Sequence, residues 1–175
     1  MKHLLVPTDF SIQSLNAVHA AVAAYKGETL KITMFHLLNM PGDISGFLFS
    51  SLKNQHLKLA GPDFKEACEI LHNRYSSCIS AINIKFGFGN TVAYVENLLE
   101  GEQVDRVVIC SDINLGTPSK DSVDAIKLIK KTGISIDILQ VVTAKKLYAD
   151  MDVINMLGGN KLKVPKTERR YAIEE

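Results

Sequence analysis

Short apolar runs recur along the chain at the spacing expected of strands in a parallel sheet. The first, His3-Leu4-Leu5-Val6, stops at Pro7 and is typical of a buried strand, because proline cannot donate a backbone hydrogen bond and is found at strand ends. Residues 30–38 alternate and then become continuously apolar, as in a central parallel strand. Three further strands are predicted, over residues 82–86, 107–110 and 134–142.

Four segments between these runs carry apolar residues three or four positions apart, which predicts helices that pack against a sheet. The first begins at Ser11, where Ser11 or Asp9 can cap it, and the second begins at Pro62. The third begins at Asn90 or Thr91. The fourth is predicted to contain Val123, Ile126, Leu128 and Ile129. Because strands and helices alternate, we expect an α/β domain with a doubly wound, open parallel sheet of five strands.

Two segments fall outside this alternation. Residues 39–61 contain the turn signal Pro41-Gly42 and the apolar Phe47-Leu48-Phe49, and they predict a flap or insertion. Near the end of the chain, Leu147, Met151, Ile154 and Leu157 fall on one helical stripe, and a charged stretch follows. We therefore expect an α/β domain over residues 1–143 and an extension of helix and charged tail over residues 144–175.

Composition narrows the classes of partner. Lysine and arginine total 20 against 19 aspartate and glutamate residues, so no net field favours nucleic acid or an anionic membrane surface. The three cysteines form no C-x-x-C pair, which argues against a disulfide framework and a structural zinc site. No secretion signal or apolar stretch of roughly 20 residues is present. A cytoplasmic protein is the expectation.

The opening stretch Val6-Pro7-Thr8-Asp9-Phe10-Ser11 is followed by an alanine-rich helix, a strand ending FHLL and a later strand VDRVVIC. This combination resembles the universal stress protein (UspA-like) family over about residues 1–142. The resemblance implies a flavodoxin-like, adenine nucleotide alpha hydrolase-like fold with strand order 3-2-1-4-5. It also implies a homodimer, with adenine-nucleotide binding in only some branches of the family.

In open sheets of this kind the ligand crevice lies outside the carboxyl ends of the strands, where the strand order reverses. That point falls between the first and fourth strands, so we expect Pro7, Thr8 and Asp9 to face Ser111 and Asp112 across a crevice. In nucleotide-binding relatives, the residues that match Asp9 and Leu37 help to frame the adenosine. An equally acceptable role for Asp9 is a helix cap or a bond to a neighbouring turn.

The phosphate-binding motif of the family, G-x-x-G-x(9)-G-S/T, is incomplete here. The sequence ICSDINLGTPSKDSVDA keeps Ser122 but has Asp121 in place of the closing glycine and a shortened loop before it. Triphosphate binding in the family manner is therefore not expected, although Lys120 could still hold a phosphate as a point charge. The simpler interpretation of this stretch is a helix start, capped by Thr117 or Ser119.

Other candidate chemistry is weaker. Asp9 and Asp112 could bind a hard cation, but two solvated turn residues explain them more simply, so no metal site is predicted. Cys68 and His72 lie one helical turn apart, a spacing that can serve metal or thiolate chemistry, but a cysteine in the core is the simpler interpretation. His36 is interpreted as a core histidine whose hydrogen bonds are satisfied. No P-loop, G-x-S-x-G or H-E-x-x-H motif occurs, and no catalytic residue is assigned.

Together these observations predict a non-catalytic binding or signalling module of the stress response, with a degenerate nucleotide crevice and no cofactor. We expect a homodimer formed through strand 134–142 and a protein partner of unknown identity. The alternative is an adenine-nucleotide sensor or slow ATPase that binds nucleotide weakly, with or without magnesium. Its crevice would use Thr8, Asp9, Lys120 and Ser122.

Overall fold

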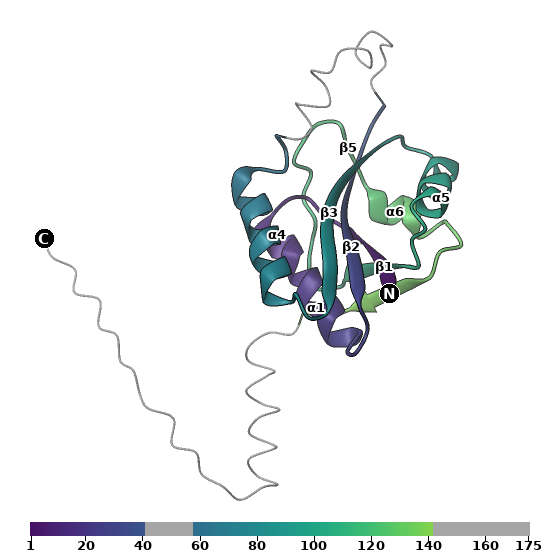
Figure 1. The fold of residues 1–175 in the computed structure, drawn as a ribbon. Helices are drawn as coiled ribbons and strands as arrows, with labels where there is room; N and C mark the ends of the chain where they lie inside the picture. The colour runs from purple at the N-terminus through teal and green to yellow at the C-terminus, as the bar shows by residue number, and fades with distance from the viewer. Residues whose placement is uncertain (41–57, 142–175) are drawn as a thin grey trace, which may run out of the picture. The chain divides into compact units, whose positions relative to one another are not determined.

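A parallel β-sheet with helices on both faces is the frame of the molecule (Figure 1). The structure is a computed structural model that describes residues 1–40 and 58–141. The predicted Phe47-Leu48-Phe49 flap and the helical stripe from Leu147 to Leu157 lie outside the described residues. No helix of the described ranges is long and apolar enough to cross a bilayer.

Five parallel strands form the sheet in the order β3-β2-β1-β4-β6. Their bounds are Lys2–Pro7 for β1, Leu30–Leu38 for β2, Ile79–Phe88 for β3, Arg106–Cys110 for β4 and Ile136–Leu139 for β6. Numbered by these five strands alone, the order is the predicted 3-2-1-4-5, so the doubly wound, flavodoxin-like architecture is confirmed.

The helices lie on both sides of this sheet. On one face lie the short 3₁₀ helix η1 (Ile12–Leu15), α1 (Asn16–Ala24) and α4 (Pro62–Arg74). On the other lie α5 (Val92–Gly101) and α6 (Ala125–Ile129). Side-chain caps begin η1 and α5: Ser11 accepts a hydrogen bond from the Ser14 amide, and Thr91 accepts one from the Tyr94 amide.

Each face of the sheet has its own apolar core. Leu4, Val6, Ile32 and Met34 are buried against α1 and α4, whereas Leu5, Phe35 and Val107 are buried against α5 and α6. This alternation along β1 and β2 follows from the two-residue period of a strand. Because both faces are covered, the central strands are apolar at nearly every position, as the sequence predicts.

One short strand was not predicted. Ser122 and Val123 form β5, which pairs antiparallel with the end of β2. The prediction that Val123 belongs to a helix is therefore wrong, because its backbone pairs with that of Leu37. The predicted caps Thr117 and Ser119 are also wrong: α6 begins at Ala125, where the Asp124 carboxylate accepts a hydrogen bond from the Lys127 amide at 3.0 Å.

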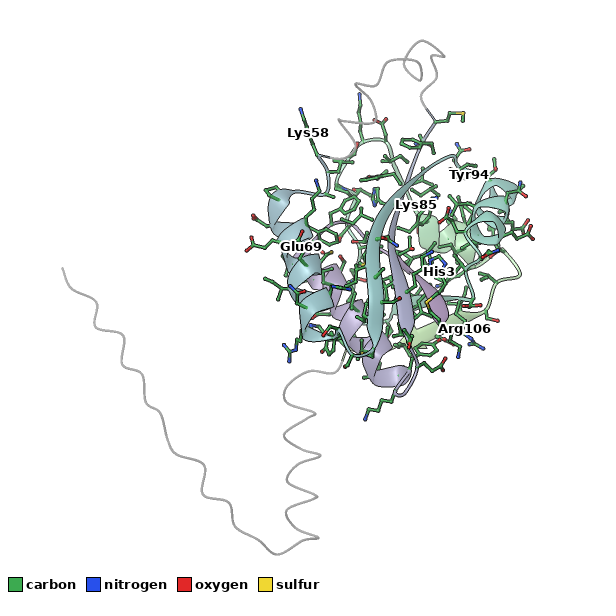
Figure 2. All side chains as sticks on the ribbon, viewed as in Figure 1. His3, Lys58, Glu69, Lys85, Tyr94 and Arg106 are labelled. Carbon is green, nitrogen blue, oxygen red and sulfur yellow. The ribbon has the colours of Figure 1, made fainter. Side chains whose placement is uncertain are left out.

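Other boundaries differ by a few residues. The apolar stripe of the second predicted helix includes Tyr75 and Ile79, but α4 ends at Arg74 and Ile79 begins β3. That strand extends beyond the predicted residues 82–86 at both ends. Toward the end of β3, Lys85 forms an ion pair with Glu102, directly after α5, and the Phe88 amide donates to the Tyr94 hydroxyl at 2.8 Å. Figure 2 labels Lys85 of β3 and Tyr94 of α5.

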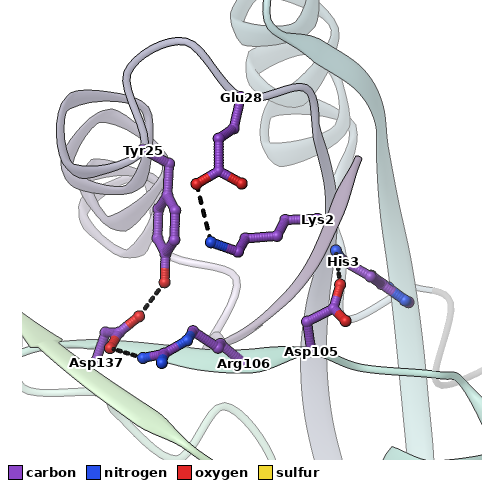
Figure 3. A network of polar contacts seen from close by, with 7 residues as sticks. All are labelled: Lys2, His3, Tyr25, Glu28, Asp105, Arg106 and Asp137. Carbon is purple, nitrogen blue, oxygen red and sulfur yellow. Dashed lines mark hydrogen bonds and ion pairs between the residues drawn. The ribbon is translucent and has the colours of Figure 1, made fainter.

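A polar network joins the amino ends of the strands (Figure 3). Asp137 on β6 accepts hydrogen bonds from Tyr25 and from Arg106, the latter at 2.6 Å. Burial, together with the hydrogen bond and charge of Asp137, raises the pKa of Tyr25 to about 12. The network connects the edge strand β6 to the end of α1 and to the start of β4.

Candidate functional site

A pocket of about 310 Å³ lies beyond the carboxyl end of β1, between the end of β2 and the loop after β4, next to the point between β1 and β4 where the strand order reverses. Its polar lining includes Thr8, His36 and Ser122, and its apolar lining includes Pro7, Phe35 and Ile126. The loop between β4 and β5 supplies one wall. This is the place at which open α/β sheets bind ligands, so the pocket is the candidate functional site.

The turn after β1 is held by buried hydrogen bonds. The Thr8 hydroxyl lies 2.7 Å from that of Ser14 and accepts a bond from the Phe10 amide at 2.9 Å. Phe10 adopts a left-handed backbone conformation with φ of 62°, which is unusual for an aromatic residue. Its ring packs against His36 and Phe86, each with centroids 5.1 Å away. The turn is therefore fixed, and the Thr8 hydroxyl is already bonded within the protein.

Asp9 connects this turn to the loop after β4. The Asp9 Oδ1 accepts two hydrogen bonds from Ser11, one from the amide at 3.0 Å and one from the hydroxyl at 2.6 Å. The Asp9 Oδ2 accepts one from the Gly116 amide at 2.7 Å. Burial acts to raise the pKa of Asp9, but the bonds from Ser11 and Gly116 outweigh it and the pKa lies below its ordinary value. The carboxylate therefore carries its charge while it holds the loop.

Gly116 is the residue that permits this approach. A Cβ atom at this position would lie 3.3 Å from the Asp9 Oδ2, closer than a comfortable contact. The absence of a side chain at this residue therefore favours the close approach of the loop after β4 to the carboxylate. We call this pairing the Asp9–Gly116 contact.

The same loop covers an open edge of β2. The last bond between β1 and β2 runs from the Thr8 amide to the Phe35 carbonyl at 2.9 Å, yet β2 continues to Leu38. β5 pairs with these last residues of β2, and the Asn39 amide donates to the Asp121 carbonyl at 2.7 Å. The chain itself therefore occupies the backbone edge that a ligand in the crevice would meet.

His36 is the side chain at the centre of the site. Its Nδ1 lies 2.6 Å from the Thr8 carbonyl oxygen and its Nε2 lies 3.0 Å from the Ser122 Oγ. Burial lowers the pKa of His36 below its ordinary value, although the Thr8 carbonyl and the Asp9 charge act in the opposite direction. The sequence interpretation as a satisfied histidine agrees with these two bonds, but it did not identify Ser122 as the partner.

Other predicted site residues lie elsewhere. Ser111 donates to Asp112 at 2.8 Å, and Asp112 accepts a bond from the Val141 amide at 3.2 Å, so this pair is engaged beside the end of β6. Leu37 is completely buried in the core. Lys120 is exposed and forms no ion pair with another described residue. Of the predicted residues, Pro7, Thr8 and Ser122 line the pocket, and Asp9 contacts its wall through Gly116.

Metal and thiol chemistry have little support in the described residues. Within residues 1–40 and 58–141, no three histidine, cysteine, aspartate or glutamate side chains are grouped so that they could hold a metal ion. Cys68 is buried, and desolvation, with the nearby charge of Glu69, raises its pKa to about 11. A thiol with this pKa is protonated at neutral pH and is a poor nucleophile or ligand.

Comparisons with known proteins identify the fold. No protein-family model and no curated protein matches the sequence. Among solved structures, the universal stress protein UspA from Lactobacillus plantarum matches with a TM-score of 0.52 at 12% identity, over 79% of this chain and 97% of that one. The hypothetical protein MJ0577 matches with a TM-score of 0.51 at 18% identity, over 82% and 98%. The hypothetical protein PH0823 matches with a TM-score of 0.50 at 19% identity, over 81% and 97%. The chain has the universal stress protein fold that its opening residues predict.

Replacing Asp9 by asparagine tests the charge at the Asp9–Gly116 contact. The free energy of unfolding of the variant should be lower by about 1 kcal/mol near pH 7. The effect is this small because the carboxylate is partly exposed to water, which screens its charge. The folded-state pKa of Asp9 lies below its ordinary value of 3.8, so the unfolded chain takes up the proton first as the pH falls. The stability difference should therefore be constant above pH 3.8 and shrink as the pH falls through the folded-state pKa. Urea unfolding at several pH values measures it.

Glu66→Gln is the control for this series, because Glu66 is exposed on α4 and forms no hydrogen bond or ion pair with other described residues. It should change stability by no more than about 0.5 kcal/mol at any pH. A pH-independent difference between the Asp9 variant and the original chain would contradict the ionised contact.

Proposed function

We propose that this chain is a universal-stress-protein-like binding and signalling module of the stress response. It acts in the cytoplasm without catalysis, as a homodimer whose nucleotide crevice is degenerate. The observation that carries the proposal is the Asp9–Gly116 contact, which places a carboxylate of the protein where the loop after β4 would otherwise present its amide to a ligand. The described domain ends at Val141, close to the predicted boundary at residue 143, which supports treating the remainder as an extension.

Electrostatics argue against phosphate in this crevice. Phosphate-binding loops work because several free backbone amides point at the anion. Here the Gly116 amide already binds a carboxylate, Asp121 lies on the same loop, and Asp124 follows β5. A carboxylate about 4 Å from a phosphate oxygen costs roughly 1 kcal/mol per charge pair in water and roughly 4 kcal/mol at an effective dielectric of 20. The single lysine of this loop, Lys120, does not compensate for several such pairs.

Calorimetric titration with ATP, with and without magnesium, tests the degenerate crevice once the purified protein has been checked for bound nucleotide. We expect no co-purified nucleotide and no saturable heat, and Asp9→Ala should leave this result unchanged. Saturable binding in the micromolar range, about −8 kcal/mol, would contradict the proposal. If Asp9→Ala then weakened that binding, the nucleotide sensor or slow ATPase would become the better account.

The dimer would form along β6. This strand is at the end of the sheet, and within the described residues only β4 pairs with it, so its other edge is open. Asp137 is held inward by Tyr25 and Arg106, whereas the neighbouring Ile138 is 65% exposed. An open strand edge beside an exposed apolar side chain is a suitable surface for a second copy of the same strand.

Substitution of Ile138 by lysine should convert the dimer to a monomer. In a two-fold symmetric dimer the same residue of both copies lies at the interface, so the substitution would bury two positive charges in an apolar contact. Sedimentation equilibrium or light scattering should then give half the mass of the original chain. Ile70→Lys is the matched control, since Ile70 is 58% exposed but lies on α4, and it should leave the mass unchanged. A monomer before any substitution would contradict the proposed interface.

A further inference from the structure

Ser122 and His36 form a hydrogen-bonded pair that lines the pocket and resembles a nucleophile with its base. The Ser122 Oγ lies 3.0 Å from the Nε2 of His36 and also accepts a hydrogen bond from the Ser119 amide at 3.1 Å. The two residues are separated by 86 positions in the sequence, yet both line the 310 Å³ pocket. A hydroxyl within hydrogen-bond reach of an imidazole that a third group orients is the arrangement of an activated nucleophile.

The second ring nitrogen fixes the direction of the hydrogen bond between them. Nδ1 lies 2.6 Å from the Thr8 carbonyl oxygen, which can only accept, so Nδ1 carries the proton. In a neutral ring Nε2 is then an acceptor, and the Ser122 hydroxyl donates to it. His36 is 5% exposed and its burial favours this neutral form. The ring is thus held in the tautomer that can remove a proton from the serine.

The pocket around the pair indicates what it could accept. Its volume is at the lower end of the range of about 300–1,000 Å³ that is usual for ligand sites. Pro7, Phe35 and Ile126 provide apolar walls, whereas Asp124 also lines the pocket and the Asp9 carboxylate contacts its wall through Gly116. A small, uncharged molecule with an aliphatic part fits this lining better than an anion does.

The backbone of the loop after β4 forms part of the pocket wall. The backbone amides of Asn114, Leu115 and Thr117 belong to residues that line the pocket. Within residues 1–40 and 58–141, no acceptor engages these three amides. Unengaged amides do not by themselves form an oxyanion site, and the acyl transfer proposed below depends only on the pair of Ser122 and His36.

From this geometry we propose that Ser122 is a nucleophile that takes an acyl group from a small, uncharged, activated ester, with His36 as its base. The Ser122 Oγ forms a bond to the acyl carbon while its proton passes to the His36 Nε2, and the carbonyl electron pair moves to oxygen. When the carbonyl re-forms, the bond to the leaving oxygen breaks, and that oxygen takes the proton from His36. The products are acyl-Ser122 and the free alcohol or phenol. This covalent modification goes beyond the binding role proposed above and requires neither nucleotide nor turnover.

p-Nitrophenyl acetate is a suitable probe because it is small, uncharged and activated. The full chain should release one equivalent of p-nitrophenolate and gain the mass of one acetyl group, which peptide mapping should place on Ser122. Ser122→Ala should abolish this modification, and His36→Gln should slow it by about 100-fold or more, as expected for loss of a general base. Ser76→Ala is the control, since Ser76 is exposed between α4 and β3, and it should acetylate at the original rate.

Three results would overturn the proposal: acetylation spread over lysines and other serines, no acetylation of Ser122, or an unchanged rate in a folded His36→Gln variant. If that variant does not fold, Ser122→Cys provides a second test, because a neighbouring imidazole lowers the pKa of a thiol. Iodoacetamide at pH 7 should alkylate the new thiol at least about 10-fold faster than Cys68 and Cys110, whose pKa values are raised by burial. A new thiol that reacts no faster than these two also overturns the proposal.

Discussion

The different lengths of β1 and β2 are the constraint on which the rest of the site depends. β1 ends at Pro7, which cannot donate a backbone hydrogen bond, whereas β2 continues to Leu38 as a fully buried strand. Buried backbone groups need partners, so the edge of β2 that opens beyond Pro7 must be covered by a ligand or by the chain. In this protein the chain covers it with β5, and the position of that short strand then determines where Ser122 meets His36.

The Asp9–Gly116 contact acts together with β5. The Asp9–Gly116 contact holds the middle of the loop after β4, and β5 holds the end of that loop, so the loop is fixed at two points. Gly116 lies where the carboxylate approaches closely, since a Cβ atom there would be 3.3 Å from the Asp9 Oδ2.

The sequence predicts the fold well and the site only in part, for physical reasons. Buried parallel strands are continuously apolar and the covering helices are amphipathic, so β2 and α4 are visible in the order of residues alone. β5 is too short to show a period, and Val123 lies at helical spacing from Ile126, which explains the wrong helix assignment. The site depends on pairs such as Asp9 with Gly116, which are 107 positions apart and have no local signal. Family resemblance pointed to the end of the sheet at which this pocket lies, and Pro7, Thr8 and Ser122 line it, but the resemblance could not indicate which partners these residues have.

The central claim is that a carboxylate of the protein holds the loop over its own crevice. Amide hydrogen exchange of Gly116, resolved by NMR, tests it most directly, with Asn114 and Thr117 of the same loop as internal references. The account predicts that Gly116 exchanges at least about 10-fold more slowly than these two residues, because its amide alone of the three is hydrogen-bonded to Asp9, and that added ATP changes nothing. Exchange of Gly116 as fast as its neighbours, or protection that appears only with ATP, would contradict it.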